Sequence, residues 1–341
     1  MIILNVKIVY ISTMIQQSMV IPLNVQCSII NQIKLFLEES VISMLSSLVN
    51  KILGSLYGFA IGDAMGATME FQEKITDESK KIKGLIGGGW LNLSPGETTD
   101  DTQMTVCVLK ALMEQANNPK KKFMDLVAKN FIDWFDSNPK DIGNTCARVL
   151  RVAKTLFDEG NDIHYVAGKM KLIAFDVKAL GNGALMRALP CALFNNIWKN
   201  LDQAFMTHNN FSQETCIVAY DALIKHLLIP DSQLGYSYGL HSISKTKEPM
   251  EPTGCVINTM NNAYYYALNC NSFEDCIINA VNDGGDADTI AAIAGSIAGA
   301  RFGYDNIPKR WKEVFKTNPL NYETIELFER VPEVLDKLKV Y

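Results

Sequence analysis

The sequence "DADTIAAIAGSIAGARFG", residues 286–303, joins an acidic start to a long run of small residues. Small residues recur at every fourth position of this stretch: Ala287, Ala291, Gly295, Gly299 and Gly303. Residues four apart lie on one face of an α-helix, so the spacing predicts a helix with a flat stripe. Glycine costs a helix interior about 1 kcal/mol relative to alanine. The stripe therefore indicates a packing demand that no larger residue would satisfy.

A second stretch, "GSLYGFAIGDAMG", has glycine at the same spacing, at Gly54, Gly58, Gly62 and Gly66. Two flat stripes let helix backbones approach closely, so we expect the two helices to pair antiparallel in the core. This pairing would bring Glu70 within about 12 Å of Asp288. The alternative is that each stripe packs against some other helix. Asp63 and Glu70, in or beside the first stripe, disfavour a membrane-dimer interpretation of the glycine spacing.

The rest of the chain also has helical periodicity. It has 341 residues, 48% of them hydrophobic and 20% charged, enough for one large core or two small ones. Strand-like alternation is scarce, and the breaks are short turn signals rather than an interdomain linker. We expect one all-α domain over residues 51–341. The predicted helices span residues 53–68, 102–116, 122–136, 145–158, 184–194, 213–228, 254–268, 273–282, 289–302 and 322–338.

Residues 1–50 differ from this pattern and are predicted to be an N-terminal extension of uncertain order. No charge occurs between Lys7 and Lys34, but polar residues and Pro22 interrupt the apolar ones. The segment is therefore neither a clean membrane span nor a tidy signal peptide. Met44 precedes the first strongly patterned segment and is an alternative start. We expect no membrane anchor.

Charge and cysteine usage exclude several classes of protein. A net charge of −5 and a pI near 5.5 argue against nucleic-acid binding, which needs a basic face. Eight scattered cysteines without a CxxC pair favour a reducing, cytoplasmic compartment over a zinc site. The four histidines lie away from the acidic motifs and are interpreted as surface or packing residues. A histidine-dependent nucleophile is disfavoured, and a monomer is the default expectation.

Two acid-rich stretches carry the chemistry, "GETTDDTQM" (96–104) and "NDGGDADT" (282–289). Threonine and aspartate are favoured at helix N-termini, which accounts for one of Asp100 and Asp101. Two adjacent carboxylates exceed what a cap needs, since like charges about 4 Å apart repel by roughly 4 kcal/mol at an effective dielectric near 20. A bound cation would reverse the sign of that interaction.

The number of acids favours a binuclear metal site. Asp100, Asp101, Asp286 and Asp288 carry four negative charges, which two divalent cations would balance. Carboxylate and hydroxyl oxygens suit Mg²⁺ or Mn²⁺ better than zinc or copper. The spacing does not match an EF-hand loop, and Asp283 is interpreted as a turn residue beside the flexible pair at 284–285.

A third stretch, "ALGNGALMRALP" (179–190), places Gly181, Asn182 and Gly183 before a predicted helix. Glycine-rich backbone entering a helix N-terminus exposes amide groups that can bind a phosphate. Alone, the motif is equally an ordinary turn. Arg187 is expected inside the helix, where both a structural ion pair and a substrate contact remain open.

Together these stretches resemble the ADP-ribosylglycohydrolase family, from about residue 50 almost to the C-terminus. The motifs, in the family's order, are "GSLYGFAIGDAMGATMEF" (54–71), "GGGWLNLSPGETTDDTQM" (87–104), "GNGALMRALP" (181–190), "PTGCVINTMNNAYYYAL" (252–268) and "SFEDCIINAVNDGGDADTIAAIAGSIAGARFG" (272–303). The resemblance implies a roughly orthogonal helical bundle with two Mg²⁺ or Mn²⁺ ions in a central cleft. It also implies hydrolysis of the bond that joins ADP-ribose to a protein side chain or a small conjugate.

The resemblance also assigns roles to individual positions. The positions that match metal ligands are Thr99, Asp100, Asp101, Asp286, Asp288 and Thr289. Glu70 matches the family's mobile acid, and we expect it to act in catalysis with Asp100 and Asp101. Gly181 and Asn182 match the loop that contacts the diphosphate, and Gly183 is predicted to join them. Two alternatives remain, a non-catalytic ADP-ribose-binding or structural protein and a binuclear nucleotide-phosphate hydrolase.

Overall fold

The structure is a computed structural model that describes residues 23–229 and 248–341. The chain divides into two compact units, residues 1–49 and 50–341, and helix α2 (Leu23–Gly66) begins in the first and ends in the second. The predicted extension lies mostly in the first unit, and its residues 1–22 are outside the described part. The candidate site belongs to the second unit alone.

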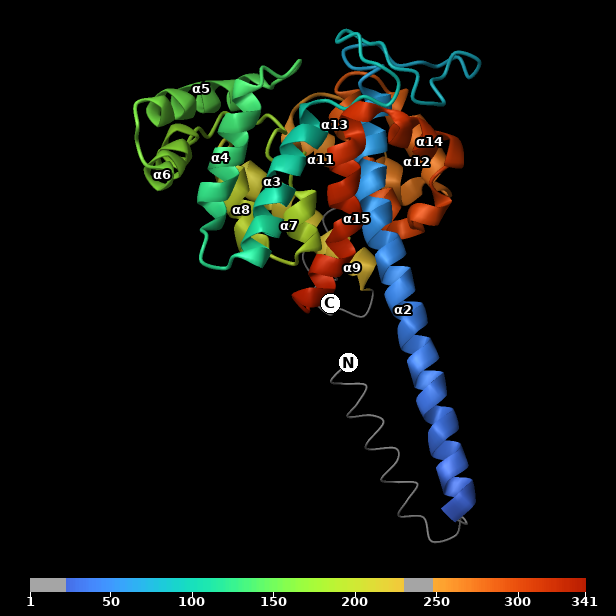
Figure 1. Ribbon diagram of the computed structural model, residues 1–341. Helices are drawn as coiled ribbons and strands as arrows, with labels where there is room; N and C mark the ends of the chain where they lie inside the picture. The colour runs from blue at the N-terminus through green and yellow to red at the C-terminus, as the bar shows by residue number, and fades with distance from the viewer. Residues whose placement is uncertain (1–22, 230–247) are drawn as a thin grey trace. The chain divides into compact units, whose positions relative to one another are not determined.

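Helices make up the regular structure of the described residues, which confirms the all-α prediction (Figure 1). Over those residues β-structure is limited to three isolated bridges, at Gly88–Leu93, Phe175–Asn209 and Gly181–Cys255. After α2 the α-helices are α3 (Asp100–Asn117), α4 (Phe123–Asp136), α5 (Asn144–Asp158), α6 (Ile163–Ile173), α7 (Leu189–Leu193), α8 (Ile197–Phe205), α9 (Phe211–Leu228), α11 (Val256–Asn269), α12 (Phe273–Val281), α13 (Ala287–Phe302), α14 (Lys309–Thr317) and α15 (Tyr322–Lys337).

Helix α13 is the centre of this unit. Every residue from Ala287 to Ala300 is buried, because α11, α12 and α9 pack against it in addition to α2. A helix that is apolar all round is expected in such a position. A second group of helices, α4, α5 and α6, packs together beside α3, as Figure 1 shows.

The two glycine stripes face each other, which confirms the predicted antiparallel pairing of α2 with α13. A methyl group added at Gly62 would lie 2.1 Å from the carbonyl oxygen of Ala291. Added at Gly58, it would lie 2.3 Å from the carbonyl oxygen of Gly295. The contacts of Gly54 with Gly299 and of Gly66 with Ala287 continue the same register. Side chains on either stripe would force the backbones apart.

Some predicted helix boundaries are wrong. The helix predicted over 184–194 begins only at Leu189, because Pro190 lies in its first turn and cannot occupy a helix interior without losing a hydrogen bond. Residues 184–187 are turns instead. Helices α6, α8 and α14 were not predicted at all. Each is short and buries few side chains, as α14 does with Trp311 and Phe315, so its apolar period is brief.

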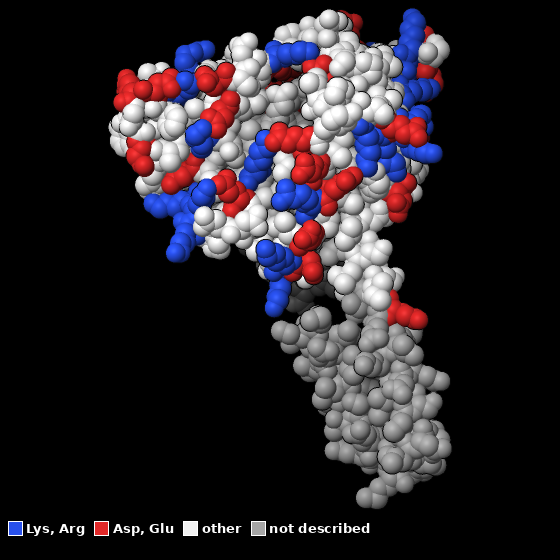
Figure 2. All heavy atoms as spheres, viewed as in Figure 1, with Lys and Arg blue, Asp and Glu red and all other residues white. Residues whose placement is uncertain are grey.

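The second half of α2 is a core helix despite its apolar length. Residues 42–66 are long and apolar enough to cross a membrane, but half of the most apolar window is buried within the protein. The glycine contacts with α13 account for that burial. On the face drawn in Figure 2, basic and acidic side chains alternate over the surface without a large patch of one sign. Nucleic-acid binding, which depends on a basic patch, gains no support from this face.

Candidate active site

The paired helices bring their acidic ends together. Glu70 follows the end of α2, and Asp286 and Asp288 begin α13. One carboxylate oxygen from each of these three side chains lies within 4.8 Å of the others, well inside the predicted limit for Glu70 and Asp288. Two backbone hydrogen bonds hold the segments in place, from Phe71 N to the oxygen of Gly285 and from Gly285 N to the oxygen of Gln72.

The turn before α13 requires glycine. Gly284 and Gly285 have φ angles of 73° and 61°, in the left-handed region that favours glycine. A side chain at Gly285 would also lie 1.9 Å from the oxygen of Pro252. Asp283 lies in the turn, as interpreted from the sequence, and pairs with Lys74 at 2.6 Å. The turn thus separates a structural aspartate from the two that enter the cleft.

The start of α3 supplies the other half of the acidic cluster. Asp100 and Asp101 are buried and line a cavity of ≈ 530 Å³ together with Glu70, Asp286 and Asp288. The two acid-rich stretches meet where the Thr289 hydroxyl donates to Asp101 Oδ2 at 3.3 Å. The structure therefore brings together the predicted acids and Thr289, from segments almost two hundred residues apart.

Thr99 is placed differently from the other predicted ligands. Its hydroxyl donates to Asp63 Oδ1 at 2.8 Å and accepts from the backbone nitrogen of Asp101 at 3.4 Å. These contacts are those of an N-cap residue, and Thr99 is not among the residues that line the cavity. Its role as a metal ligand stays a prediction.

Asp63 is a functional neighbour that sequence reasoning missed. It accepts hydrogen bonds from the backbone nitrogens and the hydroxyls of both Thr99 and Thr102. The start of α3 is thereby fixed to α2. The signal was available in the sequence, since a single aspartate inside an apolar stripe needs several donors once it is buried.

The acids are held in a destabilising environment. Burial, followed by repulsion from neighbouring carboxylates, raises the pKa of Asp100, Asp101 and Asp288 well above the usual range. Burial likewise raises the pKa of Asp286 to about 6 and of Glu70 to about 7. Among the residues that line the cavity there is no lysine or arginine to offset this charge.

Two carboxylate oxygens in the cluster lack hydrogen-bond partners. Asp101 Oδ1 and Asp288 Oδ1 are fully buried and accept no hydrogen bond. A buried, unpaired charged oxygen costs free energy unless a cation or a proton satisfies it. Hard carboxylate oxygens are the ligands that divalent Mg²⁺ and Mn²⁺ prefer, so this acidic cluster could hold a metal.

The loop at 181–183 lines the same cavity but not as predicted. No helix follows it directly, so it is not a helix N-terminus, and the backbone nitrogen of Asn182 donates to the oxygen of Gly254 at 3.0 Å. The Asn182 amide donates to Asp286 and, at 2.9 Å, to the Thr259 hydroxyl. Asn182 therefore orients a member of the acidic cluster. The contact of Gly181, Asn182 and Gly183 with a diphosphate stays a prediction.

Arg187 is a buried scaffold residue. It lies in the turn before α7 rather than in a helix, and it is 0% exposed. Its guanidinium donates to neutral acceptors on Gln203, Thr207 and Gly183 and lies over the ring of Phe131. It does not line the cavity. Arg187 therefore makes neither the ion pair nor the substrate contact that the sequence left open. Its contacts instead fix the 181–187 loop to α8 and α4.

His208 lines the cavity and is almost completely buried, so it is a packing residue, as one of the two sequence interpretations had it, and not a surface residue. Its Nδ1 lies 2.8 Å from the Thr207 hydroxyl, and its ring faces Gly183, where a side chain would come within 3.0 Å of it. Burial, then the nearby Arg187, lowers the pKa of His208 to about 3. The ring is therefore neutral at physiological pH. Nothing in its local sequence signals this position, which depends on the fold of the 174–183 segment.

Two aromatic residues form the mouth of the cleft. The Trp90 indole nitrogen donates to Glu70 Oε2 at 2.5 Å, and the Trp90 ring lies 5.5 Å from that of Phe71. Both rings are at least half exposed. Sequence reasoning missed Trp90, although a large aromatic after three glycines in a loop is an indication of a site residue.

Comparisons with known proteins agree with this geometry. The family model for ADP-ribosylglycohydrolase matches residues 44–338. The chain belongs to the ADP-ribosylglycohydrolase family. Membership supports the classification as a hydrolase that acts on ADP-ribose glycosyl bonds, and it confirms the resemblance seen in the motifs.

Two curated relatives and one solved structure illustrate the match. An ADP-ribosyl-[dinitrogen reductase] glycohydrolase from Rhodospirillum rubrum is 31% identical over 283 residues, 78% of this chain and 90% of the relative. The ADP-ribosylarginine hydrolase Tri1 from Pseudomonas putida is 26% identical and covers 84% of this chain and 80% of the relative. A solved chain from an ADP-ribosylglycohydrolase-related protein complex has a TM-score of 0.66 at 24% identity, covers 85% of this chain and 99% of its own length, and supports the family fold.

Proposed function

We propose that this protein hydrolyses the glycosidic bond between ADP-ribose and an acceptor with the help of two divalent cations, Mg²⁺ or Mn²⁺. The observation that carries the proposal is the pair of buried, unpartnered oxygens, Asp101 Oδ1 and Asp288 Oδ1, beside Glu70 in a cavity of ≈ 530 Å³. A purely structural core would satisfy or replace those oxygens. In a site for cations and substrate, the two unpartnered oxygens would be satisfied when the ligands bind.

The proposed ligands are the six predicted positions, with Asp101, Asp288 and Thr289 supported by the contacts across the cleft. When bound, the cations would neutralise the cluster, bind oxygens of the substrate and lower the pKa of a coordinated water. Asp286 is held in place by the Asn182 amide. Thr99 supports the cluster through its cap on α3 even without a direct bond to a cation.

Glu70 is the candidate for proton transfer. Departure of the acceptor from a ribosyl carbon passes through an oxocarbenium-like state, which a nearby acid assists by protonating the leaving atom. Glu70 lies at the cavity wall, and Trp90 fixes one of its oxygens. The same carboxyl group can orient or deprotonate a water in the second half of the reaction. Asp100 and Asp101 are proposed to act with it by holding the reacting groups.

The substrate is proposed to be an ADP-ribosylated protein side chain or a small ADP-ribose conjugate. Two relatives are named for ADP-ribosylated dinitrogen reductase and ADP-ribosylarginine, which makes arginine the first acceptor to test. The 181–183 loop would contact the diphosphate, and the aromatic mouth would contact the acceptor. A reducing cytoplasmic location and a monomeric state complete the proposal.

The deciding experiment is an assay of the purified full chain with ADP-ribosyl-arginine and ADP-ribosyl-serine peptides. We expect release of free ADP-ribose with Mg²⁺ or Mn²⁺, and loss of release after treatment with a chelator. ADP-ribosyl peptide that is bound but not cleaved would favour a non-catalytic reader. Release of inorganic phosphate from nucleotides without free ADP-ribose would favour the nucleotide-phosphate hydrolase.

A further inference from the structure

Exposed apolar side chains lie on three segments beside the active-site cleft, and the proposed hydrolysis gives them no role. They belong to the end of α6 with the loop that follows it, and to the first turns of α9 and α11. Single exposed apolar side chains are ordinary, but a group of them marks an interaction surface. Most of the group is 67–79% exposed. Six residues form this apolar rim: Leu172, Phe175, Val177, Leu180, Phe211 and Ile257.

Backbone hydrogen bonds join the three segments. Phe175 forms an isolated β-bridge with Asn209, two residues before α9 begins at Phe211. The backbone nitrogen of Val256, the first residue of α11, donates to the carbonyl oxygen of Leu180 at 2.8 Å. Rim residues that are distant in the sequence therefore belong to one hydrogen-bonded part of the surface.

The same backbone forms part of the cleft wall. Gly181, His208 and Gly254 line the cavity. Leu180 directly precedes the first of them, and Asn209 directly follows the second. A substrate that extends from the cleft across this wall would therefore contact the apolar rim.

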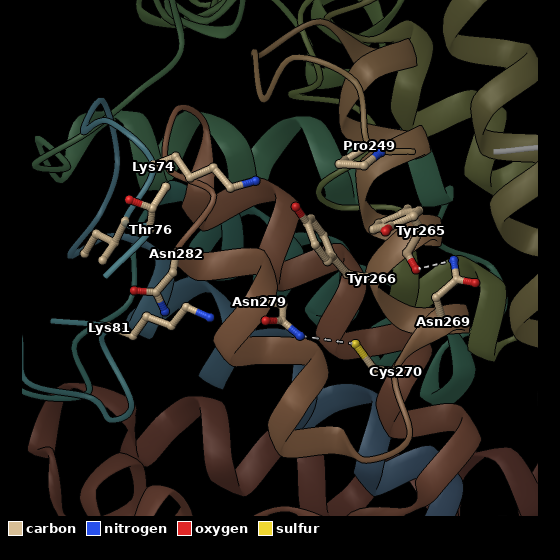
Figure 3. Close-up of a pocket in the computed structure, with 11 residues that line it drawn as sticks. Lys74, Thr76, Lys81, Pro249, Tyr265, Tyr266, Asn269, Cys270, Asn279 and Asn282 are labelled. Carbon is tan, nitrogen blue, oxygen red and sulfur yellow. Dashed lines mark hydrogen bonds between the residues drawn. The ribbon is translucent and has the colours of Figure 1, made fainter. Parts of the chain in front are cut away.

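A second cavity, of ≈ 580 Å³, differs from the rim in character (Figure 3). It shares no lining residue with the cleft, and its wall is rich in lysine, asparagine and tyrosine. Lys74 pairs with Asp283 and Lys81 with Glu78, so the charges of both lysines on this wall are balanced within the chain. The apolar rim, in contrast, exposes side-chain area that a partner would remove from water.

We propose that the apolar rim binds the protein part of the substrate, through apolar residues that flank the ADP-ribosylated side chain. The proposal rests on the proposed function, in which the ADP-ribosyl group occupies the cleft. A modified side chain reaches the cleft only when the surface around it covers the cleft wall. A small conjugate ends at its acceptor and has no apolar area to bury against the rim. The rim thus favours protein substrates with apolar flanks, through binding rather than through the chemical step.

The test compares two fluorescent peptides with ADP-ribosyl-arginine at the centre, one with leucine and phenylalanine flanks and one with serine and glycine flanks. Peptides of about 15 residues extend more than about 20 Å to either side of the modified residue. Initial rates of ADP-ribose release by the full chain with Mn²⁺ give kcat and KM, and fluorescence anisotropy gives Kd if no release occurs. We expect apolar flanks to lower KM or Kd at least about tenfold at unchanged kcat. Equal values for the two peptides would overturn the proposal.

The double variant Phe175→Ser, Val177→Ser locates the effect. It should remove the preference for apolar flanks and leave turnover of free ADP-ribosyl-arginine unchanged, because neither residue lines the cavity. Leu320→Ser is the matched control, since Leu320 is 66% exposed in the 3₁₀ turn Pro319–Asn321 and does not line the cavity either. This control should keep the preference. A double variant that also keeps it would show that the flanks bind elsewhere.

Two further outcomes are distinguishable. Sedimentation velocity of the wild type and the double variant tests a second copy of the chain as the occupant, and a dimer that dissociates in the variant would contradict the proposal. Failure to release ADP-ribose from either peptide and from free ADP-ribosyl-arginine would refute the proposed hydrolysis. A difference in Kd between the peptides would still support the rim in that case.

Discussion

Asp63 and Asp288 lie on the two helices of the same glycine-paired core, and both are almost completely buried, yet their surroundings are opposite. Asp63 accepts hydrogen bonds from two backbone nitrogens and two hydroxyls at the start of α3. Asp288 Oδ1 accepts none and faces further carboxylates across the cleft. Burial alone therefore does not distinguish a structural aspartate from a functional one. The number of hydrogen-bond donors around the carboxylate distinguishes the two.

This contrast separates stability from function. Donors offset part of the cost of burying the Asp63 carboxylate, although burial still raises its pKa to about 6, whereas Asp288 Oδ1 has no donor and carries a cost that a ligand can recover. Substitution of Asp288 should therefore lower activity without lowering the free energy of unfolding, and substitution of Asp63 should lower the free energy of unfolding.

The greatest loss of activity is expected for Asp288→Asn. Release of ADP-ribose should fall by at least about a thousandfold, roughly 4 kcal/mol of transition-state stabilisation, because a proposed cation ligand is lost. The free energy of unfolding without metal should not fall, since one repelling charge is removed. Turnover kinetics, calorimetric Mn²⁺ binding and urea denaturation measure the three quantities. Full activity in this variant would refute the proposed site.

Asp63→Ala should have the reverse profile in stability. Two backbone nitrogens and two hydroxyls would lose their acceptor in the core, and we expect the free energy of unfolding to fall by about 3 kcal/mol. Urea denaturation without metal provides the measurement. Gly168→Ala, at an exposed helical glycine with open space around it, is a control that should gain up to about 1 kcal/mol. An Asp63 variant as stable as the wild type would show that the hydrogen-bond donors around Asp63 do not contribute to stability, which would contradict the contrast with Asp288.

The buried, neutral His208 in the cleft wall should make the free energy of unfolding depend on pH. Its pKa is about 3 in the folded protein against an ordinary 6.5, so below pH 6.5 the unfolded chain binds a proton that the folded chain does not. Stability from this residue is complete above pH 6.5 and is lost as the pH falls toward 3. Between pH 8 and pH 5 the loss is about 2 kcal/mol.

His208→Asn does not titrate, so its stability should fall by about 2 kcal/mol less than that of the wild type over the same pH interval. The cleft carboxylates change in both proteins and cancel in the difference. Urea denaturation at the two pH values gives the result. Parallel pH dependence in variant and wild type would show that His208 is solvated.

A modest change is expected for Trp90→Phe, which keeps a ring but loses the hydrogen bond to Glu70. A mispositioned Glu70 should lower kcat by up to about tenfold with little change in KM for a small substrate. Trp198→Phe, on the exposed surface of α8, is the matched control. A change in KM alone would assign Trp90 to substrate contact rather than to positioning.

Much of this organisation was predictable from the sequence. The four-residue spacing of small residues predicted the α2–α13 pair, and the chemistry of adjacent aspartates predicted that 96–104 and 282–289 converge. Both signals are periodic or local. Asp63 was less visible because its meaning depends on donors from α3, thirty-six residues away.

The missed features depend on tertiary contacts. Arg187 follows the 181–183 loop in the sequence but does not line the cavity, whereas His208 lies in a stretch without glycine and does line it. The predicted helix start at residue 184 was wrong because the prediction gave the apolar spacing more weight than Pro190, which places the start at Leu189. The three glycines before Trp90 indicate a site residue, but its hydrogen bond to Glu70 depends on how the loop folds and is not encoded locally.

The constant register of the glycine pair has a consequence for insertions and deletions. Each step of four residues forward along α2 is matched by a step of four residues backward along α13, from the contact of Gly54 with Gly299 to that of Gly66 with Ala287. Deleting one residue from α2 would shift the later residues of the helix by about 1.5 Å along the axis and turn them by about 100°. The glycines would then meet side chains, and Glu70 would leave the acidic cluster at the same time. The register of the two helices thus fixes the position of Glu70 relative to the acids of α13. Insertions and deletions within these helices should therefore be selected against even where every residue type is preserved.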